Sequence, residues 1–142
     1  MLFFISLLLS ALLFPRTTDA GWREECDFGG NAMFNIIRDV PYLSTLCPSS
    51  TGRQICTMLD LSYCLMNSHG NLIPTINGHF ERSCVGCHLT GRNGTVLHCS
   101  CLLFGKDAPY QVTELDLEEI VENRNGLLAC WDSPTQLCPG FY

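Results

Sequence analysis

Leucines alternate with other residues in two short segments of the chain, residues 57–61 and residues 113–117. In each segment two leucines bracket an aspartate, and a period of two places both leucines on the same side of a β-strand. The residues that follow fit one short helical turn, and an Asn-x-x-Gly sequence then precedes a new apolar run. The pattern predicts a strand, a helical turn, a tight reversal and a second strand in each copy.

The two segments belong to a longer internal repeat. Residues 57–72 align without a gap with residues 113–128, and seven of the 16 aligned positions are identical. The identical pairs are Thr57/Thr113, Leu59/Leu115, Asp60/Asp116, Leu61/Leu117, Asn67/Asn123, Gly70/Gly126 and Leu72/Leu128. Self-similarity at a fixed period predicts a tandem of two related units. The two Asn-x-x-Gly turns remain open to two interpretations, backbone geometry alone or an additional binding role.

Residues 1–20 have the features of a signal peptide. Their apolar run of about 13 residues is shorter than the ~20 residues that a transmembrane helix needs, and small residues precede a cleavage point after Ala20. No later apolar stretch is long enough to span a bilayer. We therefore expect a secreted, extracellular mature chain of roughly 120 residues, which is enough for one domain.

The charge of the chain bears on its partners. The formal net charge is −6, and Lys106 is the single lysine. An acidic chain of this kind is poorly suited to phosphate backbones and to anionic membrane surfaces. We therefore expect no nucleic acid among its partners.

All ten cysteines lie after residue 20, and an even number in a small secreted chain predicts a disulfide framework. Each repeat offers one cysteine four residues after an aromatic residue and one four residues after a leucine, which favours the pairs Cys26–Cys47 and Cys84–Cys101. A hairpin closed by the second pair makes Cys87–Cys99 a second rung. The remaining cysteines are then expected to pair locally, as Cys56–Cys64 and Cys130–Cys138.

A metal site and an enzyme are alternatives to this disulfide framework. The second pair of cysteine motifs, with His88 and His98 beside it, superficially offers a zinc ligand set, but disulfides account for the same cysteines. The sequence contains neither a nucleophile elbow nor a metal-binding helix, and disulfide-bonded cysteines cannot act as nucleophiles. The acidic cluster Glu118, Glu119 and Glu122 fits a solvated turn. We expect no metal, no cofactor and no catalytic activity.

The ordered set of motifs, present twice, resembles the cyanovirin-N homology family of lectin-like domains. The motifs are Trp22-x-x-x-Cys26, Leu43-x-x-x-Cys47, residues 57–61 and Asn67-x-x-Gly70, followed by Phe80-x-x-x-Cys84, Leu97-x-x-x-Cys101, residues 113–117 and Asn123-x-x-Gly126. The resemblance implies an all-β fold, mainly β with short helical turns, in which two tandem repeats interleave with pseudo-two-fold symmetry. It covers residues 21–131, with repeat one at about 21–76, repeat two at about 77–131 and a C-terminal tail at 132–142.

Two departures from the family pattern stand out. Residues 28–40, within the long interval between Cys26 and Cys47, are expected to form an extended loop. Asn93 begins an Asn-Gly-Thr glycosylation acceptor in the turn before Leu97. Interleaved repeats joined near Pro74 can also exchange halves between chains, so a domain-swapped dimer is an expectation.

The resemblance further implies a shallow sugar-binding pocket, often for mannose-type glycans, at each end of the molecule. Carried over to this chain, one pocket would use Asn123, Arg124, Asn125, Glu24, Glu25 and Ser50. The other would use Asn67, Ser68, His69, His79, Arg82 and Ser83. The second end is the weaker one, because residues 102–104 are Leu-Leu-Phe where the family usually has polar residues. That apolar triplet and the longer 28–40 segment favour an alternative, a non-catalytic secreted structural or effector-like protein that binds a protein partner.

Overall fold

The computed structural model describes residues 21–26, 32–105 and 107–140. The first half contains α1 (Trp22–Glu25), β1 (Met33–Ile37), β2 (Val40–Pro48), β3 (Gln54–Asp60), the 3-10 helix η1 (Leu61–Tyr63), β4 (Leu65–Ser68) and β5 (Asn71–Pro74). The second half contains η2 (Phe80–Arg82), β6 (Cys84–Thr90), β7 (Val96–Leu102), β8 (Tyr110–Asp116), η3 (Leu117–Glu119), β9 (Glu122–Arg124), β10 (Leu127–Ala129) and β11 (Gln136–Leu137). The predicted fold, mainly β with short helical turns, is confirmed. The expected signal peptide lies outside the described residues.

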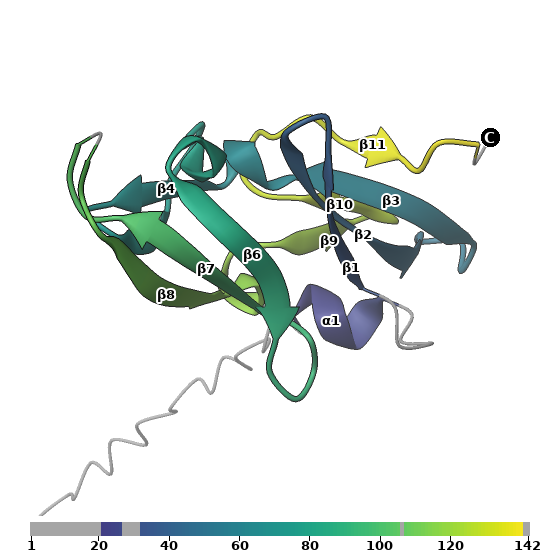
Figure 1. Ribbon diagram of the computed structural model, residues 1–142. Coiled ribbons are helices and arrows are strands. Elements are labelled where there is room, and N and C mark those ends of the chain that lie inside the picture. The colour runs from purple at the N-terminus through teal and green to yellow at the C-terminus, as the bar shows by residue number, and fades with distance from the viewer. Residues whose placement is uncertain (1–20, 27–31, 106, 141–142) are drawn as a thin grey trace, which may run out of the picture.

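The strands form two larger antiparallel sheets and two hairpins. One sheet has the order β1-β2-β3-β11, the other has the order β6-β7-β8, and β4–β5 and β9–β10 are the hairpins. The two sheets lie at opposite ends of the molecule (Figure 1). The β9–β10 hairpin of repeat two packs against β3 of repeat one, and β5 of repeat one packs against β8 of repeat two. The predicted interleaving of the repeats is therefore confirmed.

Two threonines at identical repeat positions hold each hairpin against the other repeat. The hydroxyl oxygen of Thr57 on β3 accepts a hydrogen bond from the backbone N–H of Leu128 at 2.9 Å. The hydroxyl oxygen of Thr113 on β8 accepts the equivalent bond from the N–H of Leu72 at 3.1 Å. Both threonines are buried, so each hairpin is fixed to the other repeat inside the core.

The aspartates and leucines of the repeat also have structural roles. Asp60 and Asp116 each accept a hydrogen bond from the backbone N–H two residues later, which caps the 3-10 helix that follows. The buried core contains five of the repeated leucines together with two aromatic residues: Leu59, Leu61, Leu72, Leu117, Leu128, Trp22 and Phe80. Both repeats thus contribute equivalent residues to a single core.

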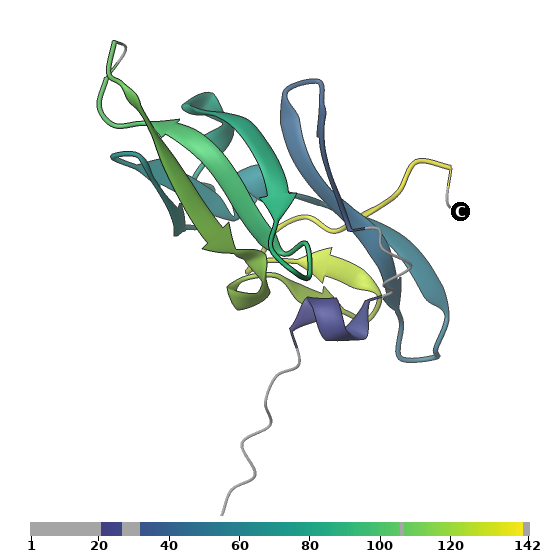
Figure 2. The ribbon, with the colours of Figure 1, turned by 60° about the horizontal axis from the view of Figure 1, so that its bottom comes forward.

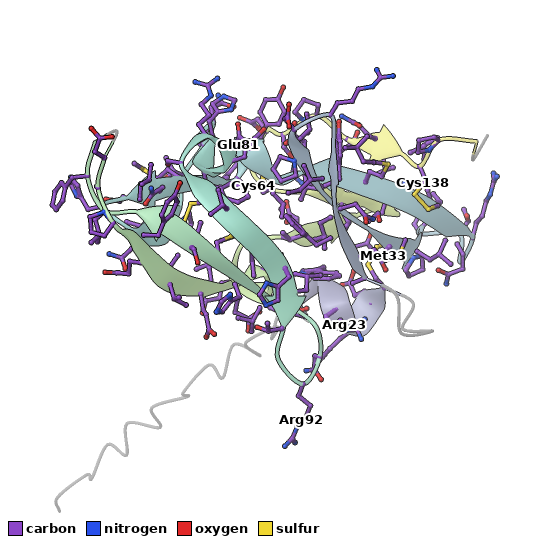
Figure 3. All side chains as sticks on the ribbon, in the orientation of Figure 1. Arg23, Met33, Cys64, Glu81, Arg92 and Cys138 are labelled. Atoms are coloured by element: carbon purple, nitrogen blue, oxygen red, sulfur yellow. A yellow bond between two sulfur atoms is a disulfide. The ribbon has the colours of Figure 1, made fainter. Side chains whose placement is uncertain are left out.

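Three disulfides form as predicted, Cys26–Cys47, Cys84–Cys101 and Cys87–Cys99. The predicted local pairs Cys56–Cys64 and Cys130–Cys138 are wrong, because the structure forms Cys56–Cys138 and Cys64–Cys130. Figure 3 labels Cys64, which lies within the core, and Cys138, which lies beside the end of the chain.

Strand geometry and interleaving explain this correction. Residues 56–60 are extended in β3 and span about 13 Å, whereas disulfide partners need Cα atoms within about 7 Å. β11 in the C-terminal tail pairs with β3 and places Leu137 opposite Thr57, which brings Cys138 beside Cys56. Both nonlocal disulfides therefore join repeat one to the end of the chain.

The expectation of an extended loop at residues 28–40 is wrong for its described part. Residues 33–37 form β1, which pairs with β2 through a tight turn at Arg38 and Asp39, both at positive φ. Figure 2 shows this hairpin rising beside the β6–β8 sheet. Residues 27–31 lie outside the described residues.

Two further expectations concern the surface. Asn93 is exposed in the turn between β6 and β7. Of the helices in the described residues, none is long and apolar enough to cross a membrane.

Candidate functional site

The two Asn-x-x-Gly turns are held by their own asparagines. The side-chain oxygen of Asn123 accepts a hydrogen bond from the N–H of Gly126 at 2.7 Å, and its amide nitrogen donates to the carbonyl of Pro48 at 3.1 Å. Asn67 repeats both contacts, with the N–H of Gly70 at 2.8 Å and the carbonyl of Leu102 at 2.9 Å. Each asparagine therefore ties its turn to the residue that follows the second cysteine of a repeat.

The turn geometry demands glycine at Gly126. Asn125 and Gly126 have φ values of 54° and 93°, the left-handed pair of a type I′ hairpin turn. A Cβ atom on Gly126 would lie only 2.6 Å from the side chain of Ile55. The turn is thus packed closely against the start of β3, and it presents the Asn125 side chain beside the 48–50 segment.

An open pocket of about 450 Å³ lies between this turn, α1 and the loop after β2. It is lined by Glu25, Pro48, Ser49, Ser50, Asn123 and Asn125. Four of the six residues predicted for this end therefore come together, Glu25, Ser50, Asn123 and Asn125. The backbone N–H of Ser50 donates to the side-chain oxygen of Asn125 at 2.7 Å, which fixes the orientation of that amide.

The other two predicted residues do not line this pocket. Glu24 is exposed on α1, and the guanidinium of Arg124 pairs with the carboxylate of Glu122. This ion pair lies within one strand, and the sequence signal for it was a basic residue two positions after an acidic one.

A second, more acidic pocket of about 320 Å³ adjoins the first and shares Glu25 and Asn123 with it. Glu118, Glu119 and Glu122 also line it, and sequence reasoning assigned these three residues only to a solvated turn. Glu118 is half-buried, and its carboxylate accepts a hydrogen bond from the backbone N–H of Arg23 at 2.8 Å. Burial raises the pKa of Glu118, and the negative charges of Asp116 and Glu24 add to the rise.

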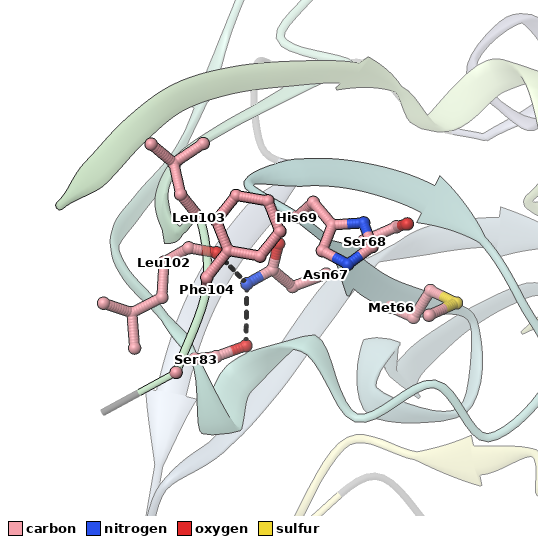
Figure 4. A pocket seen from close by; sticks show the side chains of 9 residues that line it. Met66, Asn67, Ser68, His69, Ser83, Leu102, Leu103 and Phe104 are labelled. Carbon is pink, nitrogen blue, oxygen red and sulfur yellow. Dashed lines mark hydrogen bonds between the residues drawn. The ribbon is translucent and has the colours of Figure 1, made fainter. Parts of the chain in front are cut away.

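The opposite end of the molecule carries a pocket of about 430 Å³ (Figure 4). It is lined by Met66, Asn67, Ser68, His69, Ser83, Leu102, Leu103, Phe104 and Gly105. Four of the six predicted residues come together here as well, Asn67, Ser68, His69 and Ser83. The other two do not line the pocket, because His79 and Arg82 lie near Glu81, at 3.2 Å and 3.9 Å respectively.

Comparison with protein families gives one match. The family described as the CVNH domain matches residues 34–129, which is more than half of the chain. This chain belongs to the CVNH family.

Solved CVNH structures share the fold. The CVNH protein of Gibberella zeae superposes with a TM-score of 0.59 at 20% identity, over 77% of this chain and 95% of that protein. Microvirin, solved in complex with mannobiose, gives 0.60 at 23% identity over 78% and 98%. A MoCVNH3 variant, solved in complex with (N-GlcNAc)4, gives 0.58 at 17% identity over 74% and 99%. A comparison with curated protein sequences found no match.

The two end pockets of this CVNH chain are equivalent by repeat position but differ in residue type at most of the matched positions. Every residue that lines the Asn123 pocket has a repeat counterpart in the Asn67 pocket: Glu25/Ser83, Pro48/Leu102, Ser49/Leu103, Ser50/Phe104, Asn123/Asn67 and Asn125/His69. The first set is largely polar, whereas the second includes two leucines and a phenylalanine. The rings of Phe104 and His69 lie 4.9 Å apart, and Phe104 is 65% exposed.

The two asparagines also differ in what they leave available. The amide nitrogen of Asn67 donates to Ser83 and to Leu102, both at 2.9 Å, so both of its N–H groups are engaged (Figure 4). Asn123 donates to Pro48, which leaves one N–H for a ligand. The asparagines therefore hold the turns in both repeats, and within the described part of the chain only Asn123 keeps an N–H without a partner.

Proposed function

We propose that this protein binds carbohydrate, without catalysis, through the pocket at the Asn123 turn. The observation that carries the proposal is the convergence of one carboxylate, two serine hydroxyls and two side-chain amides on one open surface. These groups come from three separate segments of the chain. Sugar hydroxyls both donate and accept hydrogen bonds, and planar carboxylates and amides offer partners in fixed directions.

Two features of this pocket support the proposal further. Among the described residues, no side-chain hydrogen bond or ion pair engages the carboxylate of Glu25, so both of its oxygens can accept from a ligand. The Asn125 oxygen is already bound to Ser50, which orients the amide N–H groups of Asn125 before a ligand arrives. An orientation fixed in advance lowers the entropy lost on binding.

The compared structures support a glycan as the ligand class. Microvirin was solved with mannobiose and the MoCVNH3 variant with an N-acetylglucosamine oligomer. We propose a mannose-type glycan or another oligosaccharide for this chain, bound at one end. The Asn67 pocket is excluded from the proposal because both N–H groups of its turn asparagine are engaged, and because Leu103 and Phe104 stand where the other pocket has two serines.

A glycan array with the purified, oxidised protein tests this function. The informative variants are Glu25→Ala and Asn125→Gly, since glycine keeps the positive φ of position 125 while removing its side chain. His69→Gly is the matched control, because His69 occupies the equivalent position of the other turn with a φ of 50°. Selective binding that is lost in the first two variants and kept in the control supports the proposal. Silence from folded wild-type protein across the array refutes it.

Secretion is part of the same proposal. Five disulfides suit an oxidising compartment, and they join all the cysteines of the described chain. We propose removal of residues 1–20 and glycan attachment at Asn93. Mass spectrometry of protein from culture medium checks both, and an N-terminus other than Gly21 would contradict the cleavage site.

Binding of a protein partner is the second candidate function, and the Asn67 pocket favours it. Phe104 is 65% exposed above Leu102 and Leu103, and aromatic side chains in such positions are common at protein interfaces. Phe104→Ser gives this pocket the residue that Ser50 provides at the other end. If Phe104→Ser and wild type bind the same glycans equally well on an array, the Phe104 surface takes no part in sugar binding.

A further inference from the structure

Three polar side chains form a row across the outer face of the β6–β7–β8 sheet. His88 on β6 lies directly opposite His98 on β7, and Glu114 on β8 lies opposite His98. Side chains of directly opposed residues project from the same face of a sheet. Leu97 and Cys99, the neighbours of His98 along β7, are buried, so His98 and its two partners belong to the outer face.

The two imidazole rings already have a spacing that suits a shared ligand. Their centroids are 4.7 Å apart, and their planes are tilted by 44°. Two imidazoles that bind one zinc ion at about 2.0–2.1 Å with tetrahedral geometry have ring centres about 5 Å apart. The ring spacing is therefore compatible with one nitrogen of each ring binding the same ion.

Hydrogen bonding prepares His88 for this role. Its Nδ1 lies 3.0 Å from the carbonyl oxygen of Gly86. A carbonyl can only accept, so Nδ1 carries the proton and Nε2 presents a lone pair. Metal-binding histidines commonly donate their second ring nitrogen to a backbone carbonyl in this way.

Among the described residues, no hydrogen bond engages the His98 ring. Its Nδ1 is buried and has no hydrogen-bond partner among the described residues. No described protein group fixes the tautomer of this ring, so Nδ1 can carry the proton while the lone pair of Nε2 binds a metal ion. Glu114 beside it adds a negative charge that favours a cation.

We propose that His88 and His98 form a surface binding site for a divalent transition-metal ion, with Glu114 next to it and water completing the coordination. In the described part of the chain, no group of three or more His, Cys, Asp or Glu side chains is positioned to hold a metal ion, so the proposed site has two protein ligands. The neighbouring cysteines are disulfide-bonded and supply no thiolate. Imidazole ligands favour Cu²⁺, Ni²⁺ and Zn²⁺ over Mg²⁺ and Ca²⁺, and Cu²⁺ is expected to bind most tightly.

The experiment titrates the oxidised full-length protein with NiCl₂ and, separately, with ZnCl₂, and isothermal titration calorimetry measures the binding. We expect saturable binding of one ion per chain. His88→Ala and His98→Ala each remove a ligand, and each is expected to weaken binding at least about tenfold, since loss of an outer-shell partner alone costs 10–100-fold. Glu114→Gln is expected to weaken binding less, because it removes a charge and keeps both rings. His79→Ala is the control, since His79 lies outside the site, and it is expected to bind like wild type.

Two results would overturn the proposal. One is an affinity that stays unchanged in the His88→Ala/His98→Ala double variant, which would place any binding elsewhere. The other is the absence of saturable binding at millimolar concentrations of either ion. Thermal unfolding of every variant in EDTA checks that the fold is retained. The site shares no residue with the Asn123 pocket, so its failure leaves the proposed sugar binding untouched.

Discussion

Removal of the disulfide Cys56–Cys138 offers the sharpest test of the chain topology. The change is Cys56→Ser/Cys138→Ser, a double substitution that leaves no lone thiol from this pair. The disulfide spans 82 residues, and a single cross-link over that length stabilises a protein by about 4.5 kcal/mol in the chain-entropy description.

The nested disulfide reduces this value. Cys64–Cys130 already closes a loop of 66 residues inside the 82, so the outer disulfide restricts only the difference, 16 residues of unfolded chain. A loop of that size corresponds to about 3 kcal/mol. The double variant is therefore expected to lose about 3 kcal/mol of unfolding free energy and about 10–20 °C in Tm.

Guanidinium unfolding followed by tryptophan fluorescence measures the loss, since Trp22 is buried in the core. A loss below about 1 kcal/mol would refute the reasoning, because it would show that this disulfide hardly lowers the conformational entropy of the unfolded chain. A loss near the full value for 82 residues would show that the inner disulfide does not form.

Peptide mapping checks the connectivity itself. Trypsin releases residues 54–82 and 125–142 as separate peptides from reduced protein, because Arg53, Arg82 and Arg124 flank them. Two disulfides join these peptides in the structure. Recovery of the two as separate peptides from unreduced wild-type protein would refute the topology and restore the local pairs Cys56–Cys64 and Cys130–Cys138.

Three further predictions concern buried or half-buried groups. Thr57→Val leaves the N–H of Leu128 without its acceptor inside the core and is expected to lose about 1–3 kcal/mol in urea unfolding, and a change within about 0.5 kcal/mol would contradict this role. Gly126→Ala is expected to lose more stability than Gly52→Ala, because both have positive φ but only the first Cβ would clash; equal losses would disprove the close packing of the turn. Burial raises the pKa of Glu118 above its ordinary value of 4.5, so wild type loses stability as the pH rises from 4.5 through the raised pKa. Glu118→Gln is expected to lack this pH-dependent loss. Urea midpoints that run parallel for the two proteins across this pH range would contradict the burial effect.

Much of the fold could be predicted because the repeat records it twice. The alternation at residues 57–61 and 113–117 specified β3 and β8, and the two Asn-x-x-Gly sequences specified the two hairpin turns. The three predicted disulfides that form join neighbouring strands or nearby segments, where spacing along the chain is informative.

The remaining features depend on contacts that spacing does not record. Cys130 reaches Cys64 because a hairpin from repeat two packs on repeat one, and Cys138 reaches Cys56 because β11 adds to β3. The β1–β2 hairpin was missed because its turn, Arg38-Asp39, contains no glycine and resembles an ordinary loop.

The candidate site could be predicted to a similar degree. Four of the six residues predicted for each end line one pocket. Of the predicted residues that do not line a pocket, Arg124, Arg82 and His79 each lie near a glutamate one or two positions away. Long charged side chains pair with opposite charges that lie near them on the surface, and the motif alone does not specify which charges those are.

If two chains exchange halves, the two disulfides between the repeats make the oligomeric state depend on the folding history. A chain that oxidises as a monomer is locked by Cys64–Cys130 and Cys56–Cys138, because both bonds tie one repeat to the other end of the same chain. If two chains exchange halves before oxidation, the same cysteine pairs instead form disulfides between the two chains. Such a dimer would be covalent, would survive dilution and denaturant, and would separate only on reduction. Non-reducing electrophoresis therefore records whether disulfide formation preceded or followed chain exchange, a kinetic distinction preserved in the covalent structure.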